Sequence, residues 1–275
     1  VVSIAGSWDT SSVTTGTFTS TSSTVTLTGA ARTVRTSGSQ SFAALALTGS
    51  TSQLSPLTAT GNLTIAAGSS LTTSSNALTV QGGLTLNGAG FLASGTSTVQ
   101  VSGNVLVAGA GAYVSAGAGS WSVGGSWTNN STSPSWSFLA PITFNASASQ
   151  AMTFGNLTPE FSGNVTFSSL SAAPVVFTMN TNAVRWGGVL TINDASSSTT
   201  LATSGLALVG GSLNVGNGGV LTANASTVTV SAVTMIGGAT GVLTVPTGAW
   251  TIAGSWNTTG AGSTWNAGTT ITYTF

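Results

Sequence analysis

A short phrase that alternates apolar and small polar residues returns through the first half of the chain at a fixed spacing. It reads GNLTI from Gly61, GGLTL from Gly82 and GNVLV from Gly103, so each copy begins 21 residues after the one before. In the second half, the matching apolar position recurs at less regular intervals, at Val165, Leu190, Leu213, Val233 and Trp256. A sustained period of this length is typical of proteins in which one small unit stacks on the next.

The phrases predict strands with one buried face, because alternation with period two places successive side chains on opposite faces. Leu63 and Ile65 are expected to point inward, and Asn62 and Thr64 outward. Gly and Asn at the start of each phrase suit tight corners. The sequence therefore predicts an all-β fold, a parallel β-solenoid (β-helix) of roughly 12 coils with about 21–25 residues per coil. Tandem β-sandwiches are the competing fold, since their strands also recur at short intervals.

The sequence also has a longer repeat, of about 120–130 residues, that spans several coils. Its opening phrase is SIAGSW at 3–8, SVGGSW at 122–127 and TIAGSW at 251–256. We therefore expect a first long repeat over 1–120, a second over 121–249 and the start of a third, or a docking end, over 250–275.

Both ends of the sequence read as uncapped strands, VVSIAGSW and TTITYTF. Open strand edges invite another chain to add on, and repeated head-to-tail contact gives an open filament. We therefore expect the partner to be the protein itself, as a head-to-tail homopolymer, or the coils to continue within a longer repetitive chain. The expected junction residues are Trp8, Trp127, Trp256, Val1, Ile4, Ile271, Tyr273 and Phe275.

Charged side chains make up 2% of the chain, against roughly 25% in an ordinary soluble domain. Three arginines cannot form the basic stripe that nucleic-acid binding needs, and no apolar run is long enough for a spanning helix, so we expect neither nucleic-acid binding nor membrane insertion. Apolar residues still reach 41%, enough for a buried core. The ionisable side chains are Asp9, Arg32, Arg35, Glu160, Arg185 and Asp194.

These few groups argue against an enzyme. Glycoside hydrolysis needs two carboxylates about 5–9.5 Å apart, whereas Asp9, Glu160 and Asp194 are several coils apart in the sequence. The many Ser and Thr have no His or Lys to activate them, and the chain lacks the His, Cys or clustered carboxylates of metal sites. We predict no catalytic residue, no metal site and no cofactor. Glu160 and Arg185 lie about one coil apart, which suggests a structural ion pair across coils.

The tryptophans near the repeat junctions have two interpretations. A surface row of aromatic rings could stack on sugars, whereas buried rings would fill the core. In the phrase GSW, the tryptophan takes the inward position held elsewhere by Leu63, which favours core packing. The residues concerned are Trp121, Trp127, Trp136, Trp250, Trp256 and Trp265.

Several asparagines have Ser or Thr two places on and are possible glycosylation sites. A glycan would supply the solubility that charge does not. At predicted coil corners, which include Asn62 and Asn164, inward stacking as an Asn ladder is the rival use. The candidate sites are Asn62, Asn129, Asn130, Asn145, Asn156, Asn164, Asn224 and Asn257.

The segment GSWTNNSTSPSWSFLAPITFNASASQAMTFGNLT at 125–158 resembles the Thr/Ser/Gly-rich repeats of large surface proteins of bacteria and archaea. Those repeats are similar to the filamentous haemagglutinin and autotransporter class of β-solenoid adhesins. The phrase FGNLTP departs from them by placing Pro where a strand residue is usual. The resemblance implies fibre and adhesion roles and no catalysis.

Together these features predict a structural β-solenoid, extracellular or at the cell surface, that builds a fibre, sheath or matrix. Its surface of Ser, Thr, Ala and Gly would change little with pH or salt. The alternative is an adhesin or carbohydrate-binding module that contacts surface glycans through exposed tryptophans.

Overall fold

The computed structural model describes residues 1–13, 18, 22–37, 40–194, 197–235, 241–245, 248–257, 264–267 and 271–273. The chain packs as two compact units. Unit 1 comprises Val1–Val123 and Thr128–Ala140, and unit 2 comprises Gly124–Trp127 and Pro141–Phe275. The units are defined by packing, so the long repeats expected over 1–120, 121–249 and 250–275 remain a prediction. Phe275 lies outside the described residues.

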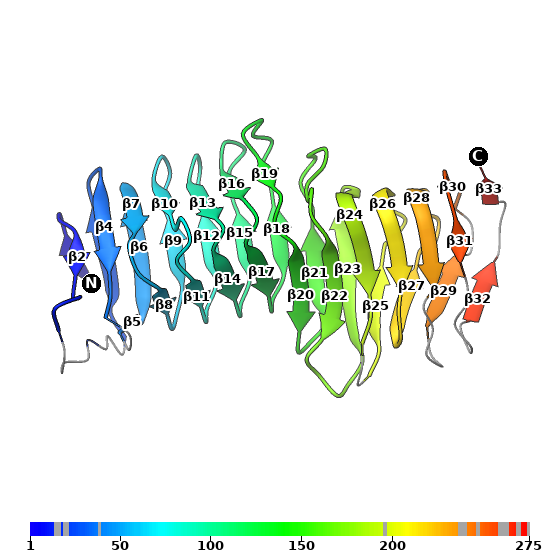
Figure 1. Cartoon of the computed structure of the whole chain (residues 1–275), viewed down its shortest axis with the longest axis horizontal. Coiled ribbons are helices and arrows are strands. Elements are labelled where there is room, and N and C mark those ends of the chain that lie inside the picture. The colour runs from blue at the N-terminus through cyan, green and yellow to red at the C-terminus, as the bar shows by residue number, and fades with distance from the viewer. Residues whose placement is uncertain are drawn as a thin grey trace. The chain divides into compact units, whose positions relative to one another are not determined.

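Unit 1 is a solenoid with three parallel sheets (Figure 1). Sheet A contains β1 (Val2–Ile4), β3 (Thr24–Thr28), β6 (Ala44–Thr48), β9 (Leu63–Ile65), β12 (Leu84–Leu86) and β15 (Val105–Val107). Sheet B contains β2 (Trp8–Asp9), β4 (Arg32–Arg35), β7 (Ser50–Gln53), β10 (Ser70–Thr72), β13 (Phe91–Gly95), β16 (Tyr113–Ala116) and β19 (Ser137–Phe138). Sheet C contains β5 (Ser41–Phe42), β8 (Leu57–Ala59), β11 (Leu78–Val80), β14 (Thr98–Val101) and β17 (Ser120–Val123).

Unit 2 is a solenoid with two parallel sheets. One contains β21 (Gln150–Thr153), β23 (Val175–Thr181), β25 (Thr199–Ala202), β27 (Gly219–Thr222), β29 (Val242–Val245) and β32 (Thr264–Ala267). The other contains β20 (Ile142–Ala146), β22 (Val165–Ser169), β24 (Val184–Ile192), β26 (Leu208–Val215), β28 (Val228–Met235), β30 (Trp250–Ile252) and β33 (Ile271–Tyr273), with β31 (Trp256–Asn257) also paired to β28. Strand β18 (Trp127–Asn129) includes residues of both units.

The expected fold is confirmed: about 11 turns of roughly 22 residues, with no helix among the described residues. The strand pairs are parallel, which excludes the Greek-key sandwiches that were the alternative. The residues that the sequence repeat aligns are also the ones that pair between neighbouring strands. Neighbouring coils pair at Leu63, Leu84 and Val105 in unit 1, and at Val165, Leu190, Leu213, Val233 and Trp256 in unit 2.

Side-chain alternation fills the interior of each unit. Leu63 and Ile65 are fully buried, whereas Asn62 is exposed and Thr64 is half-buried on the opposite face, as predicted. The same arrangement recurs from coil to coil, because in-register parallel pairing stacks each side chain on its counterpart. Aromatic side chains fill part of the core of unit 2, where the ring centroid of Phe167 lies 5.1 Å from that of Phe144 and 5.1 Å from that of Phe177.

Candidate functional site

The three tryptophans of the long repeat lie in different environments. Trp8 is half-buried in β2 and pairs with Val34 of β4, so it lies in sheet B rather than in the column of Leu63. Trp256 is half-buried in β31 and pairs with Val233. Trp127 is fully buried. The coils differ in length, so the same phrase reaches a different part of each coil.

Trp127 is enclosed by side chains of unit 2. Its ring centroid lies 5.8 Å from that of Phe144 and 5.5 Å from that of Phe161. Its Nε1–H donates to Oε1 of Glu160, 2.9 Å away, and Glu160 is also fully buried. A side chain without exposed surface offers none to a second molecule. Trp127 therefore packs the interior, although the sequence placed it at a subunit junction.

The tryptophans as a group favour packing over an exposed aromatic row. Half-buried indoles are found at Trp8, Trp136 and Trp256. The remaining described indoles are buried, and they belong to Trp121, Trp127, Trp186 and Trp250. Trp186, for which the sequence predicted no role, is 2% exposed and donates from Nε1 to the carbonyl oxygen of Ser212 at 3.1 Å.

The other proposed junction residues lie in the first and last described strands. Val1 lies directly before β1 and is 93% exposed. Ile4, the last residue of β1, is half-buried and pairs with Leu27. The backbone of Ile271 and Tyr273 lies in β33 and pairs with β30. No feature of these strands by itself identifies a subunit contact.

The proposed glycosylation sites divide by exposure. Asn129 is 1% exposed and its Oδ1 accepts from the backbone N–H of Ser131 at 2.9 Å, so the folded chain has no room for a glycan there. Asn145 is half-buried. The remaining six are exposed: Asn62, Asn130, Asn156, Asn164, Asn224 and Asn257.

Two of these asparagines also connect coils through their side chains. Asn62 Oδ1 accepts from the backbone N–H of Gly83 at 2.8 Å, and Asn164 Oδ1 accepts from Val189 at 2.9 Å. In each case the donor lies one coil further along the chain. Both asparagines are exposed and bond to backbone N–H groups, so the inward Asn ladder that the sequence suggested is not found at these positions. Each uses its acceptor oxygen and not the amide nitrogen to which a glycan attaches.

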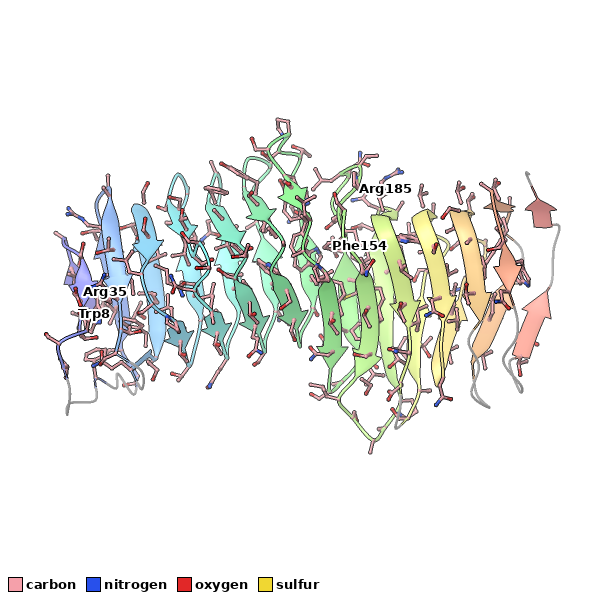
Figure 2. The ribbon with its side chains drawn as sticks, in the orientation of Figure 1. Trp8, Arg35, Phe154 and Arg185 are labelled. Carbon is pink, nitrogen blue, oxygen red and sulfur yellow. The ribbon has the colours of Figure 1, made fainter. Side chains whose placement is uncertain are left out.

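The carboxylates have separate surroundings. Asp9 is exposed, and hydrogen bonds from the side chain and backbone of Ser11 hold its pKa below the ordinary value, with a smaller effect from Arg35 on the neighbouring strand (Figure 2). This favours the ionised form, so any stabilisation by Asp9 is lost only as the pH falls through its lowered pKa. Asp194 is 6% exposed and accepts from Ser197 Oγ at 2.8 Å and from Thr199 Oγ1 at 3.1 Å.

Glu160 and Arg185 meet through the backbone. The N–H groups of Glu160 and Phe161 both donate to the carbonyl oxygen of Arg185 at 3.1 Å. The Glu160 carboxylate accepts from Trp127 in the interior, while the Arg185 side chain projects from the outer edge of the ribbon (Figure 2). Their proximity was predicted correctly from the spacing of one coil, but the connection is a pair of main-chain hydrogen bonds.

A corner built around a buried hydroxyl occurs in both units and was missed in the sequence. In unit 1, Thr73 Oγ1 donates to the carbonyl oxygen of Ser94 at 3.0 Å and also contacts Ser97 Oγ in the next coil. In unit 2, Thr203 Oγ1 contacts the Ala223 carbonyl oxygen at 2.9 Å and Ser226 Oγ. All four hydroxyl side chains that meet in these pairs are fully buried.

The local backbone is the same in the two corners. The residue after each threonine has positive φ, 59° at Ser74 and 54° at Ser204. The turn then closes by a bond to the threonine carbonyl oxygen, from Asn76 N in one case and from Leu206 N in the other, at 2.9 Å. The only sequence signal is Thr-Ser directly after a strand, and Ser and Thr are so frequent here that it does not stand out.

Replacing Thr73 by valine should lower the free energy of unfolding by about 1–3 kcal/mol, because valine has the same shape but leaves buried polar groups without their partner. Chemical denaturation followed by circular dichroism measures the change. Thr79, which is half-buried on the outer face of β11, is the matched control, and Thr79→Val should stay within about 0.5 kcal/mol of the parent. Equal losses in the two variants would contradict a role for the corner hydroxyl.

Comparison of the chain with models of protein families, with curated proteins and with solved structures gave no match. The described residues contain no helix that is long and apolar enough to cross a membrane. Nor do they contain a group of three or more His, Cys, Asp or Glu side chains that could hold a metal ion.

Proposed function

We propose that the chain is a structural element of the cell exterior, a β-solenoid that builds a surface fibre, sheath or matrix. The coils would stack end to end between copies of the protein, or continue within a longer repetitive polypeptide. The observation that carries the proposal is the in-register ladder itself, in which each coil offers the next one the same row of backbone hydrogen-bonding groups. Stacking of this kind extends without limit unless a cap stops it.

The outer faces support the same proposal. In unit 2, one outward column runs through Thr143, Thr166, Thr191, Asn214 and Thr234. These side chains are short and uncharged, so rods that pack side by side on them would not repel one another. Salt and pH would have little effect on such contacts, because almost nothing on the surface titrates or is screened.

Electron microscopy of the native material tests the proposal. We expect long continuous rods with axial layering of about 4.8 Å, the spacing between hydrogen-bonded strands. We also expect the rods to persist in about 1 M salt, where the Debye length is about 3 Å and charge-driven assemblies weaken. Discrete particles with no continuation at either end would exclude the filament.

A carbohydrate-binding adhesin is the second candidate, and one aromatic pair favours it. Phe91 and Tyr113 occupy outward positions on neighbouring strands of sheet B and are half-buried. Their rings stack with centroids 4.2 Å apart and an angle of 20° between planes. Apolar ring surface beside hydroxyl groups suits a neutral sugar, and this pair would take the role that the sequence analysis gave to tryptophans.

Binding to an array of neutral glycans tests this second candidate. If the pair forms the contact, Tyr113→Ala and Phe91→Ala should each lower binding at least tenfold, and Thr79→Val on sheet C should leave it unchanged. Binding that survives in both aromatic variants would exclude this pair as the glycan contact.

A further inference from the structure

Strand β7 places two polar side chains inside the core of unit 1. Thr51 is 2% exposed and Gln53 is 1% exposed, although both occupy inward positions that apolar residues fill in most coils. In the ladder, Thr51 pairs with Arg32 on one side and Leu71 on the other. Polar groups buried in this way cost free energy unless they are hydrogen-bonded.

The nitrogen of the Gln53 side-chain amide has a hydrogen-bond partner. Its Nε2 donates to the carbonyl oxygen of Ala77 at 2.6 Å, in the next coil. This bond also fixes the amide orientation, because the reverse assignment would bring two oxygen acceptors together. Gln53 Oε1 is therefore the atom that needs a donor.

Two side-chain oxygen atoms of β7 lack a hydrogen-bond partner. Thr51 Oγ1 and Gln53 Oε1 are buried, and neither has a hydrogen-bond partner among the described residues. A buried polar atom without a hydrogen-bond partner destabilises the folded state, and strand β7 carries two of them on one face. Buried polar groups in native proteins are normally satisfied by protein or by ordered water.

The geometry and the chemistry of the site favour water. Thr51 and Gln53 lie two positions apart on the same face of β7, so their side chains are neighbours. One water with two hydrogen bonds of about 2.8 Å can join polar atoms up to about 5.6 Å apart. Gln53 Oε1 can only accept and the Thr51 hydroxyl can donate or accept, a combination that one water molecule satisfies. The charged neighbour in the ladder, Arg32, is directed elsewhere, since its Nε donates to the carbonyl oxygen of Thr28 at 3.2 Å.

We propose that unit 1 binds an ordered internal water between Thr51 Oγ1 and Gln53 Oε1. The water would extend the polar corner described above, because Asn76 Nδ2 donates to the carbonyl oxygen of Gln53 at 3.1 Å, and the Asn76 backbone closes the turn at Thr73. The water, Gln53, Asn76 and Thr73 would then form one polar cluster in the interior of unit 1.

Magnetic relaxation dispersion of oxygen-17 counts long-lived internal waters in solution and tests the proposal directly. The double variant Thr51→Val with Gln53→Met should hold one such water fewer than the parent. Thr79→Val, on the outer face, should hold the same number as the parent. An equal count in the double variant and the parent would overturn the proposal.

The stability of the Thr51→Val variant is an independent test, because the substitution should destabilise the protein if the water is bound and stabilise it if no water is bound. With the water bound, Thr51→Val removes one of its partners and should lower the folded-to-unfolded ratio about fivefold, while Thr51→Ser keeps the oxygen and should lose less. Without it, Thr51→Val removes an unsatisfied hydroxyl and should raise the ratio. A crystal structure decides the identity of the ligand, since a peak with five or more oxygen ligands at about 2.4 Å would be a cation and would refute a water.

Discussion

Replacing Trp127 by alanine should lower the free energy of unfolding of unit 2 by about 5 kcal/mol. The substitution opens a cavity beside Phe144 and Phe161, which costs about 3–5 kcal/mol for a buried aromatic side chain. It also removes the donor that Trp127 Nε1 provides to the buried carboxylate of Glu160, and a hydrogen bond to a charged group contributes about 1.5–3 kcal/mol. Chemical denaturation followed by far-ultraviolet circular dichroism measures the loss.

Two variants separate these effects. Trp127→Phe keeps most of the ring contacts and loses the donor, so it should cost about 2 kcal/mol. Trp256→Phe changes a half-buried indole and should cost less than about 1 kcal/mol. If Trp127→Ala were no more harmful than Trp256→Phe, the buried position of Trp127 would be incorrect.

Gly49→Ala should destabilise unit 1 by about 3 kcal/mol, the upper end of the cost of overpacking. A Cβ atom at Gly49 would overlap the backbone carbonyl oxygen of Gly29 and lie 2.5 Å from its carbonyl carbon. Both glycines directly follow the paired strands β3 and β6, so neither backbone can move without breaking the ladder. Coils separated by the ordinary strand spacing leave no room for a methyl group where two corners stack.

Hydrogen exchange localises this effect. Amides of β3 and β6 should exchange faster in Gly49→Ala, because the ladder opens next to the substitution. Gly6→Ala is the matched control, since a Cβ there meets nothing within 4 Å, and its free energy of unfolding should change by less than about 0.5 kcal/mol. Similar losses in both variants would mean that close approach is not the reason for glycine at 49.

The coil ladder could be predicted because its signals are local. Alternation marks each strand, and glycine or asparagine marks many corners, so the column through Val165, Leu190 and Leu213 follows directly from the sequence. The position of the GSW phrase in the fold was harder to predict, since the sheet that its tryptophan joins depends on how many residues precede it in the coil. Trp8 consequently lies beside Val34 in sheet B, and not in the column of Leu63.

For two other features, the prediction required knowing whether a polar side chain points into the core or outward. Asn129 and Asn130 are adjacent and both match the glycosylation pattern, yet one is buried and the other exposed. Strand alternation from Trp127 would have separated them, because residues 127 and 129 share a face. Gln53 could not be placed in the same way, since a polar residue in an alternating strand is normally read as the outward one.

The parallel ladders have a mechanical consequence. Hydrogen bonds between coils point along the direction in which the coils stack, so tension in that direction loads them head-on. In unit 1 that load is divided among three ladders, sheets A, B and C. Each turn is then one link in a series, and the force that the unit withstands is set by whichever single turn carries the fewest bonds.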